Sequence, residues 1–340
     1  MIKQFFLSFI FISLLLIAGC AHQRMPQFVA AKQAPVVVET YDGYAGGGRL
    51  LQQSFAQAPQ RVLAVSEAVV ENLIFLGVAD HIAAVSECYS KSYAPYEEQF
   101  AKFAWLTKGT GYPSKEAVLD LKPDLIVSWG SLFGDSALGS AQYWHDKGIH
   151  TYIMKNTVPT RATGRRRVKY FVDDLQSLAQ IFRVEKKNKD KIAQLRQRIK
   201  GLQAASDSTP NAQKPTVVTL QYLYGNEYFG RTYTDMTADM IELAGGVSLD
   251  DELGGRKSIE YLVKLNPDII VVIDTANTPV AKKLQALRQH KVLGKLKAVR
   301  NNRFFVLEHR AFYCGSLRTV EAVEALAQYI KSLYFTDGKK

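Results

Sequence analysis

One fourteen-residue pattern occurs twice in this chain of 340 residues, and the two copies start 144 positions apart. The first copy runs from Ser114 to Val127 and the second from Ser258 to Val271, and seven positions carry the same residue in both. In each copy a helix-forming stretch leads to a proline, and a continuously apolar stretch follows. Proline ends a helix, and a short apolar run is typical of a strand covered on both faces. The repeat therefore predicts two similar α/β lobes, each with a helix that leads into a buried parallel strand.

The first twenty residues have the features of an export signal. Lys3 precedes an apolar run over 5–18, which is shorter than the roughly 20 residues of a membrane span. The run ends in Ile17-Ala18-Gly19-Cys20, which resembles the bacterial lipobox. We therefore expect a lipoprotein signal peptide over 1–19 and lipidation of Cys20, with anchoring on the extracytoplasmic face of a bacterial membrane. The alternative is an ordinary secretory signal that happens to contain a cysteine.

The rest of the chain is too long for one ordinary domain and is expected to form two. We predict a lipid anchor, tether and entry hairpin over 20–59 and an N-terminal lobe over 60–183. A connecting helix is predicted over 184–204 and a C-terminal lobe over 214–340. The connecting stretch carries an apolar stripe and many lysines. A single helical connection should allow only small closure of the lobes.

Strands and helices alternate in both predicted lobes. In the first lobe we expect strands at 61–65, 82–85, 125–128 and 151–154, with helices at 66–77, 114–121 and 143–147. In the second we expect strands at 216–222, 269–273 and 304–307, with helices at 235–244, 281–290 and 318–334. Residues 223–233, rich in tyrosine and glycine, are expected to form a loop.

Charge and metal-binding residue types narrow the functional classes. The chain has 43 Lys and Arg against 32 Asp and Glu, a net charge of +11. Because the protein is expected to be exported, an anionic ligand or membrane surface is favoured over nucleic acid. The six histidines are scattered, which argues against a histidine-built metal site. Cys88 and Cys314 fall on loops of different lobes, and free thiols, a disulfide or binding of a soft metal all remain open.

Seven stretches, in order along the chain, make up one pattern: 59–63, 71–77, 114–127, 239–246, 258–271, 299–306 and 318–322. Together they resemble a class III periplasmic substrate-binding protein, the type that serves importers of ferric siderophores, cobalamin and haem. The resemblance implies two Rossmann-like lobes with parallel sheets, joined by one long helix, with the ligand between the lobes. It also implies a monomeric binding protein that is not an enzyme, has no cofactor of its own and delivers its ligand to an ABC permease dimer.

The family docks onto arginines of the permease through one glutamate on each lobe, and the repeat assigns this role to Glu116 and Glu260. Each glutamate lies two residues after a serine that is expected to cap its helix. The helix dipole favours a negative charge in this first turn. The bare residue pattern also fits two acids that merely stabilise their helices.

In this architecture the ligand lies at the carboxyl ends of the strands. Aromatic and arginine side chains are abundant on the loops there, and they suit a large, flat, anionic guest such as a ferric chelate. We favour a ferric siderophore, with cobalamin or haem as alternatives, and His309 or a tyrosine as a possible ligand of haem iron. An exported reductase or chelatase on the same scaffold is the rival class. Arg165-Arg166-Arg167 is expected to be a solvated helix start. The predicted ligand-binding residues are Tyr89, Tyr93, Trp129, Tyr224, Tyr228, Arg231, Arg310 and Tyr313.

Overall fold

The computed structural model describes residues 34–87, 94–107, 111–252, 254–275 and 278–337. The chain divides into two units, Met1–Ala34 and Pro35–Lys340. Only Ala34 of the first unit is described. All the described residues of both hydrophobic cores belong to the second unit. Pro35–Lys340 therefore carries its own hydrophobic cores, which is the condition for a domain to fold alone. Among the described helices, none is long and apolar enough to cross a membrane.

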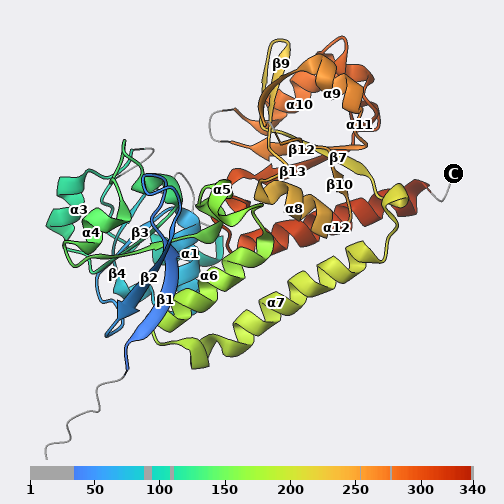
Figure 1. The fold of residues 1–340 in the computed structure, drawn as a ribbon. Coiled ribbons are helices and arrows are strands. Elements are labelled where there is room, and N and C mark those ends of the chain that lie inside the picture. The colour runs from blue at the N-terminus through green and yellow to red at the C-terminus, as the bar shows by residue number, and fades with distance from the viewer. Residues whose placement is uncertain (1–33, 88–93, 108–110, 253, 276–277, 338–340) are drawn as a thin grey trace, which may run out of the picture. The chain divides into compact units, whose positions relative to one another are not determined.

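The N-terminal lobe is a parallel sheet that is preceded by an antiparallel hairpin of β1 and β2 (Figure 1). The sheet has the order β4-β3-β5-β6, so the first strand along the chain lies between the second and the third. The elements are β1 (Val36–Tyr41), β2 (Leu50–Phe55), β3 (Val62–Val65), α1 (Glu67–Leu76), β4 (Ile82–Ser86), α3 (Lys115–Leu121), β5 (Leu125–Ser128), α4 (Ala141–His145), β6 (His150–Ile153) and α6 (Val168–Ile181).

The C-terminal lobe repeats this topology, with a parallel sheet in the order β10-β7-β12-β13. Its first strand again lies between its second and third. The elements are β7 (Thr216–Leu220), α8 (Met236–Leu243), β10 (Val247–Ser248), α9 (Ile259–Leu265), β12 (Ile269–Asp274), α10 (Val280–Gln289), β13 (Phe304–Glu308) and α12 (Leu317–Asp337). Two parallel α/β lobes, as the sequence predicts, are confirmed.

The doubled pattern forms the same structure in both lobes. Ser114 and Ser258 cap α3 and α9, each accepting a hydrogen bond from a backbone N–H three residues later. Each helix ends at a left-handed residue, Lys122 or Asn266, just before the proline. The strand that follows is the third of its sheet in both cases.

The C-terminal lobe has an additional antiparallel sheet, in the order β11-β9-β8. It consists of β8 (Tyr222–Tyr224), β9 (Glu227–Gly230) and β11 (Gly255–Ser258). The expectation of a loop over 223–233 is therefore wrong for most of its length. Tyr224, Tyr228 and Gly230, which suggest a loop, lie in a tight hairpin that turns at Gly225 with φ of 55°.

Helix α7 (Glu185–Asp207) connects the lobes where the sequence predicts a connecting helix. Its buried residues Ile192, Leu195 and Ile199 recur at helical spacing and join the larger core. The remaining described helices and turns are short. They are η1 (Ala79–His81), η2 (Ala94–Tyr96), α2 (Glu97–Phe100), η3 (Gly130–Phe133), η4 (Lys155–Thr157), α5 (Thr160–Thr163), η5 (Asn211–Gln213), η6 (Leu293–Lys295), α11 (Lys297–Arg300) and η7 (His309–Ala311).

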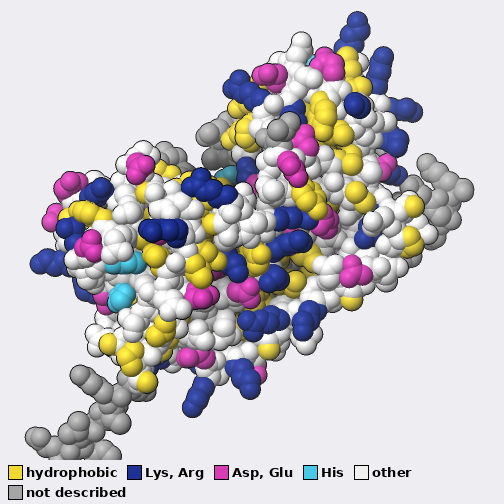
Figure 2. Space-filling model, in the orientation of Figure 1, with side chains coloured by type: hydrophobic (Ala, Val, Ile, Leu, Met, Phe, Trp, Pro, Cys, Tyr) yellow, Lys and Arg dark blue, Asp and Glu magenta, His cyan; other side chains and the backbone are white. Residues whose placement is uncertain are grey.

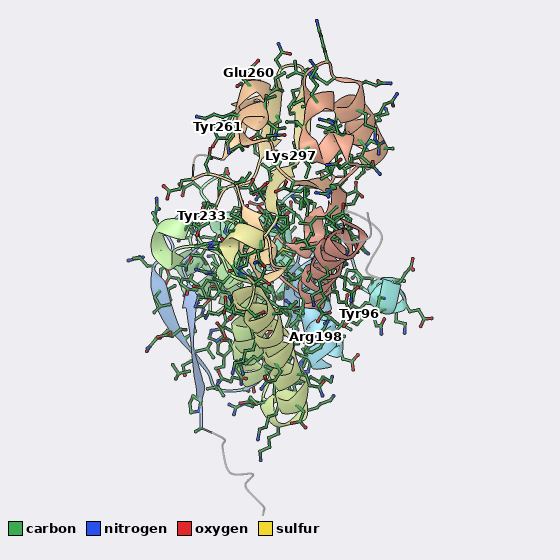
Figure 3. The ribbon with its side chains drawn as sticks, turned by 90° about the vertical axis from the view of Figure 1, so that its right-hand side faces the viewer. Tyr96, Arg198, Tyr233, Glu260, Tyr261 and Lys297 are labelled. Carbon is green, nitrogen blue, oxygen red and sulfur yellow. The ribbon has the colours of Figure 1, made fainter. Side chains whose placement is uncertain are left out.

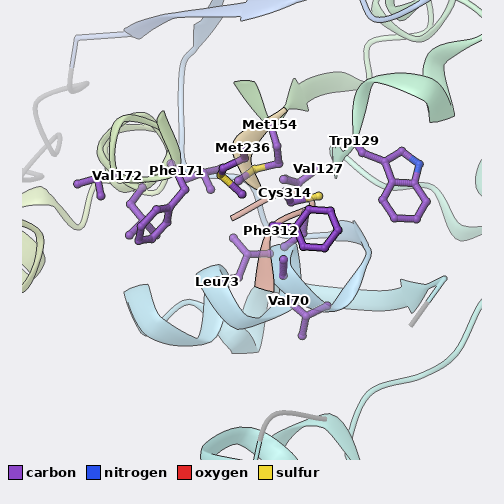
Figure 4. Packing of buried hydrophobic residues seen from close by; sticks show 14 of the residues in the cluster. Val70, Leu73, Val127, Trp129, Met154, Phe171, Val172, Met236, Phe312 and Cys314 are labelled. Atoms are coloured by element: carbon purple, nitrogen blue, oxygen red, sulfur yellow. The ribbon is translucent and has the colours of Figure 1, made fainter. Parts of the chain in front are cut away.

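The larger hydrophobic core contains residues from both lobes. Met236, Phe312 and Cys314 of the C-terminal lobe pack with Leu73 and Val127 of the N-terminal lobe (Figure 4). Because wide opening would expose this shared apolar surface to water, the packing opposes large hinge motion. This arrangement favours the prediction that the lobes close only slightly, which remains a prediction.

Candidate functional site

The segments that follow three strands meet between the lobes. Ser66 and Glu67 follow β3, Trp129 follows β5, and Arg310 and Tyr313 lie in the segment after β13. Glu67 pairs with Arg310 at 3.1 Å, and the rings of Trp129 and Tyr313 meet edge to face at 5.4 Å. We call Glu67, Trp129, Arg231, His309, Arg310 and Tyr313 the inter-lobe site. It joins the carboxyl ends of both parallel sheets, where ligands bind in such folds.

Trp129 and Tyr313 form the aromatic part of the inter-lobe site. Trp129 is only 8% exposed, and its indole Nε1 has no hydrogen-bond partner among the described residues. Burial, reinforced by the neighbouring Cys314, raises the pKa of Tyr313 to about 12. The Tyr313 phenol therefore stays protonated and neutral at physiological pH. Together the two residues offer neutral hydrogen-bond donors on an apolar surface.

His309 lies against the same tyrosine. Its ring stacks on Tyr313 at 5.6 Å and meets Phe312 at 5.3 Å. Burial, followed by the positive charges of Arg231 and Arg310, lowers the pKa of His309 to about 4. The imidazole is therefore neutral near pH 7 and keeps a nitrogen lone pair that can accept a hydrogen bond or bind a metal.

Arg231 and Arg310 carry the positive charge of the site, but each has a resident carboxylate partner. Arg231 lies over the ring of Phe312 at 5.1 Å, donates to Gln221 Oε1 at 3.1 Å and forms an ion pair with Asp235. Arg310 is held by Glu67 across the lobes. These acids orient the guanidinium groups and reduce the net positive charge that a ligand would meet.

Two of the predicted tyrosines lie elsewhere in the C-terminal lobe. Tyr228 is fully buried in the smaller hydrophobic core, so a role in ligand contact is not supported. It lies on β9, where alternate side chains point to opposite faces, and it occupies the inward face. Tyr224, at the hairpin end, is 48% exposed and lies beneath Arg256 at 5.3 Å.

Several predictions concern residues outside the described part of the chain: Cys20, Cys88, Tyr89 and Tyr93. Cys314 is described, and it is a buried free thiol with its Sγ 3.5 Å from the hydroxyl of Ser66. Burial raises the pKa of Cys314 to about 12, so its reactive thiolate is strongly disfavoured. The free thiol of Cys314 contradicts a disulfide with Cys88. The soft-metal hypothesis also depends on Cys88, which lies outside the described residues, and stays a prediction.

The arginine run is not the solvated helix start that the sequence suggests. Its three members pair in order with Glu242 at 2.8 Å, Asp235 at 3.5 Å and Asp239 at 2.9 Å, all in the C-terminal lobe. Arg165 also lies 4.1 Å over the ring of Tyr233. Residues 165–167 therefore attach the start of α6 to α8.

The two acids of the repeat are exposed at the first turns of α3 and α9. Hydrogen bonds from its own backbone N–H and then from Ser114 lower the pKa of Glu116. The equivalent bonds, with Ser258 as the partner, lower the pKa of Glu260. Figure 3 shows Glu260 at the outer end of the C-terminal lobe. Both groups are ionised anions available to a cationic partner.

A cavity of about 400 Å³ lies away from the inter-lobe site, beside the ends of α7 and α8. Its polar lining includes Arg167, Lys214 and Asp239, whose charges are of both signs. Within the described ranges, no group of three or more His, Cys, Asp or Glu residues is arranged to hold a metal ion.

Comparisons with known proteins agree with this architecture. A periplasmic binding protein from Veillonella parvula is 20% identical, with a TM-score of 0.75 over 89% of this chain and 93% of that one. An ABC-type Fe3+-hydroxamate transport system from Saccharomonospora viridis is 17% identical, with a TM-score of 0.68 over 86% and 98%. The periplasmic vitamin B12-binding protein of Vibrio cholerae is 21% identical, with a TM-score of 0.56 over 80% and 97%.

At these identities the likenesses show a shared fold. No curated protein sequence matches the chain. The profile of the family described as periplasmic binding protein matches residues 62–311, which is well over half of the chain. The chain therefore belongs to the periplasmic binding protein family, the extracytoplasmic solute-binding components of ABC importers.

Proposed function

We propose that this protein captures a ferric chelate, most specifically a ferric siderophore, and delivers it to an ABC permease. One observation carries the proposal: Trp129 and Tyr313 form an aromatic pair at the meeting of the two sheets, flanked by Arg310. Broad aromatic faces bind a bulky chelate, and a guanidinium group binds its oxygen atoms. One structural relative, the ABC-type Fe3+-hydroxamate transport system, supports the same ligand class.

Haem is a second candidate, because a specific observation favours it. His309 is neutral at physiological pH and stacks on Tyr313, so both common types of axial ligand lie together at the site. One structural relative bears the name heme binding protein HmuT. Haem would enter here as transported cargo.

A binding panel separates these candidates. The probes are a ferric hydroxamate, the same hydroxamate without iron, haem and cobalamin, with thermal shift and tryptophan quenching as readouts. A ligand present at a hundred times its Kd stabilises the native state by about 2.7 kcal/mol. We expect the ferric hydroxamate to raise Tm and to be recovered chemically unchanged. Turnover of the chelate would support the reductase or chelatase alternative, and no shift with any probe would refute the proposal.

Trp129→Phe tests the site directly, because it keeps an aromatic ring and removes the buried indole N–H. Loss of one hydrogen bond, worth about 1 kcal/mol, should weaken ferric hydroxamate binding about fivefold. Trp105→Phe is the matched control, since Trp105 is 36% exposed and lies outside the inter-lobe site. If the two substitutions changed ferric hydroxamate affinity equally, Trp129 would not contact the ligand as proposed.

Docking is proposed to use Glu116 and Glu260. Their exposure and lowered pKa values support a role as paired anions for arginines of a permease. Glu116→Lys with Glu260→Lys should abolish permease binding in a pull-down while ligand affinity stays unchanged. Glu98→Lys with Glu252→Lys carries the same change in charge at other exposed acids and should retain binding. Unchanged permease binding by the first pair would disprove the assignment.

Anchoring through a lipid on Cys20 completes the proposal and rests on the lipobox-like sequence. Mass spectrometry of the protein from membranes should show diacylglycerol on this cysteine. Cys20→Ala should release the protein from the membrane fraction. An unmodified Cys20 in the membrane-bound form would contradict the anchor.

A further inference from the structure

Helix α7 carries more positive charge than its role as a connector requires. Between 186 and 200 it has seven Lys and Arg residues and one acid, Asp190. A helix turns about 100° per residue, so Lys186, Lys189, Arg196 and Lys200 fall within about 80° of one another. We call these four residues the α7 stripe. All four are exposed, and the buried Leu195 lies across the helix from them.

Among the described residues, the charge of the α7 stripe has no counter-charge in an ion pair. Arg198, outside the stripe, pairs with Glu324 at 2.7 Å and links α7 to α12. Within the described part of the chain, none of the four stripe residues forms an ion pair or a hydrogen bond with another side chain. Figure 2 shows Lys and Arg side chains gathered over the face along which α7 runs. An exposed row of cations favours an anionic partner.

The first described strand, β1, lies near the amino-terminal end of α7. Val36, at the start of β1, pairs with Phe55 of β2. The backbone oxygen of Phe55 accepts a hydrogen bond from Arg183 at 3.3 Å, and that of Ala56 accepts another at 3.0 Å. Arg183 precedes α7 by two residues. The first described strand therefore lies next to the start of the lysine-rich half of α7.

We propose that the α7 stripe binds anionic phospholipid headgroups and holds the protein against the membrane that carries its anchor. The choice of a membrane as the partner rests on the proposed lipid anchoring. A polybasic patch is the usual second signal that strengthens lipid attachment, at about fivefold in partition for each basic residue near the surface. Figure 3 shows Glu260 well apart from Arg198 of α7, so the proposed lipid contact lies away from this docking residue.

Vesicle flotation of Pro35–Lys340 tests the proposal without any contribution from the apolar amino-terminal run. The vesicles contain phosphatidylcholine alone or with 30 mol% phosphatidylglycerol, at low and at physiological salt. We expect binding to the phosphatidylglycerol vesicles that weakens as salt rises. Replacing all four stripe residues by Glu should lower the partition coefficient about a hundredfold or more, given about fivefold for each lost cation.

A charge-matched variant separates the α7 stripe from net charge. Replacing the exposed Lys264, Lys282, Lys291 and Lys295 by Glu makes the same change in charge within the C-terminal lobe. This control should keep most of the lipid binding. Equal losses in both variants, or binding that ignores phosphatidylglycerol, would overturn the proposal. So would retention on an anionic polysaccharide column without vesicle binding.

The outcome is independent of ligand capture. The stripe variant should show the wild-type thermal shift with ferric hydroxamate, which also shows that it is folded. If no chelate binds the wild type while the lipid result stands, the ligand proposal fails alone. The four stripe residues can also be replaced by Gln one at a time. If their electrostatic contributions add, each substitution should weaken vesicle binding by a similar factor. If the fourfold variant does not fold, this series is the deciding test.

Discussion

The buried ion pair between Glu71 and Arg318 gives a quantitative test of how the lobes are joined. Glu71 lies on α1 and is 3% exposed, while Arg318 lies on α12 and is 7% exposed. Arg318 also pairs with Glu308 at 2.9 Å, and the Glu308 side chain is 63% exposed. Burial raises the pKa of Glu71, and the charge of Arg318 opposes that rise. Removing Arg318 would leave a buried acid without its main counter-charge.

We expect Arg318→Met to lower the free energy of unfolding by about 3–5 kcal/mol, the usual cost of breaking a buried pair from one side. For a protein of this size that corresponds to a fall in Tm of roughly 6–15 °C. Glu71→Leu combined with Arg318→Met should lose less than the single Arg318 variant, because no charge is then left buried. Glu308→Gln, which removes only the exposed partner, should cost less than about 1 kcal/mol.

Urea unfolding followed by circular dichroism measures these differences, and pH adds an independent check. In Arg318→Met the folded pKa of Glu71 should rise further above its unfolded value. The native state then binds the extra proton at low pH, so the loss of stability should be smaller near pH 5 than near pH 8. A double variant as unstable as the sum of its singles, or a pH-independent loss, would refute the reasoning.

Three other predictions concern buried groups and backbone strain. Burial raises the pKa of Asp174 to about 8, so stability should fall by a few kcal/mol as pH rises from about 4 to 8, and Asp174→Asn should remove that slope in urea titrations. Cys314 should react with a thiol reagent only after denaturation, as counting against Cys314→Ala will show; rapid native labelling would contradict its burial. Gly315 has φ of 92°, and an added Cβ would lie 2.5 Å from Phe171 Cβ. Gly315→Ala should therefore cost more than the roughly 1–2 kcal/mol expected for Gly148→Ala, which has φ of 75° and open space around it, and equal losses would rule out the clash.

The local elements could be predicted because their signals are local. A serine cap, a proline and an apolar run determine α3 with β5 and α9 with β12. The bounds of α3, β5 and β12 agree closely with those predicted from the sequence. The position of Trp129 and Tyr313 after strands also placed them at the sheet ends. Their contact with a ligand stays a prediction.

Contacts between distant residues could not be predicted in the same way. The Glu67–Arg310 pair joins residues more than two hundred positions apart, and the sequence around neither residue indicates its partner. The sequence around 165–167 suggests solvated arginines, because their acidic partners at α8 are distant along the chain. The tyrosines and glycines around Tyr228 predict a loop, whereas Tyr228 lies on a strand between β8 and β11, and β11 is distant along the chain.

The additional antiparallel sheet distinguishes Glu260 from Glu116, its counterpart in the other lobe. β9 pairs with all four residues of β11, and α9 begins at the residue after β11 ends. The other end of β9 leads directly to Arg231 at the inter-lobe site. The paired strands therefore form a continuous backbone connection between Arg231 and the first turn that carries Glu260. Among the described residues Glu116 has no connection of this kind, so under the proposed docking only the Glu260 contact is joined by paired strands to the inter-lobe site.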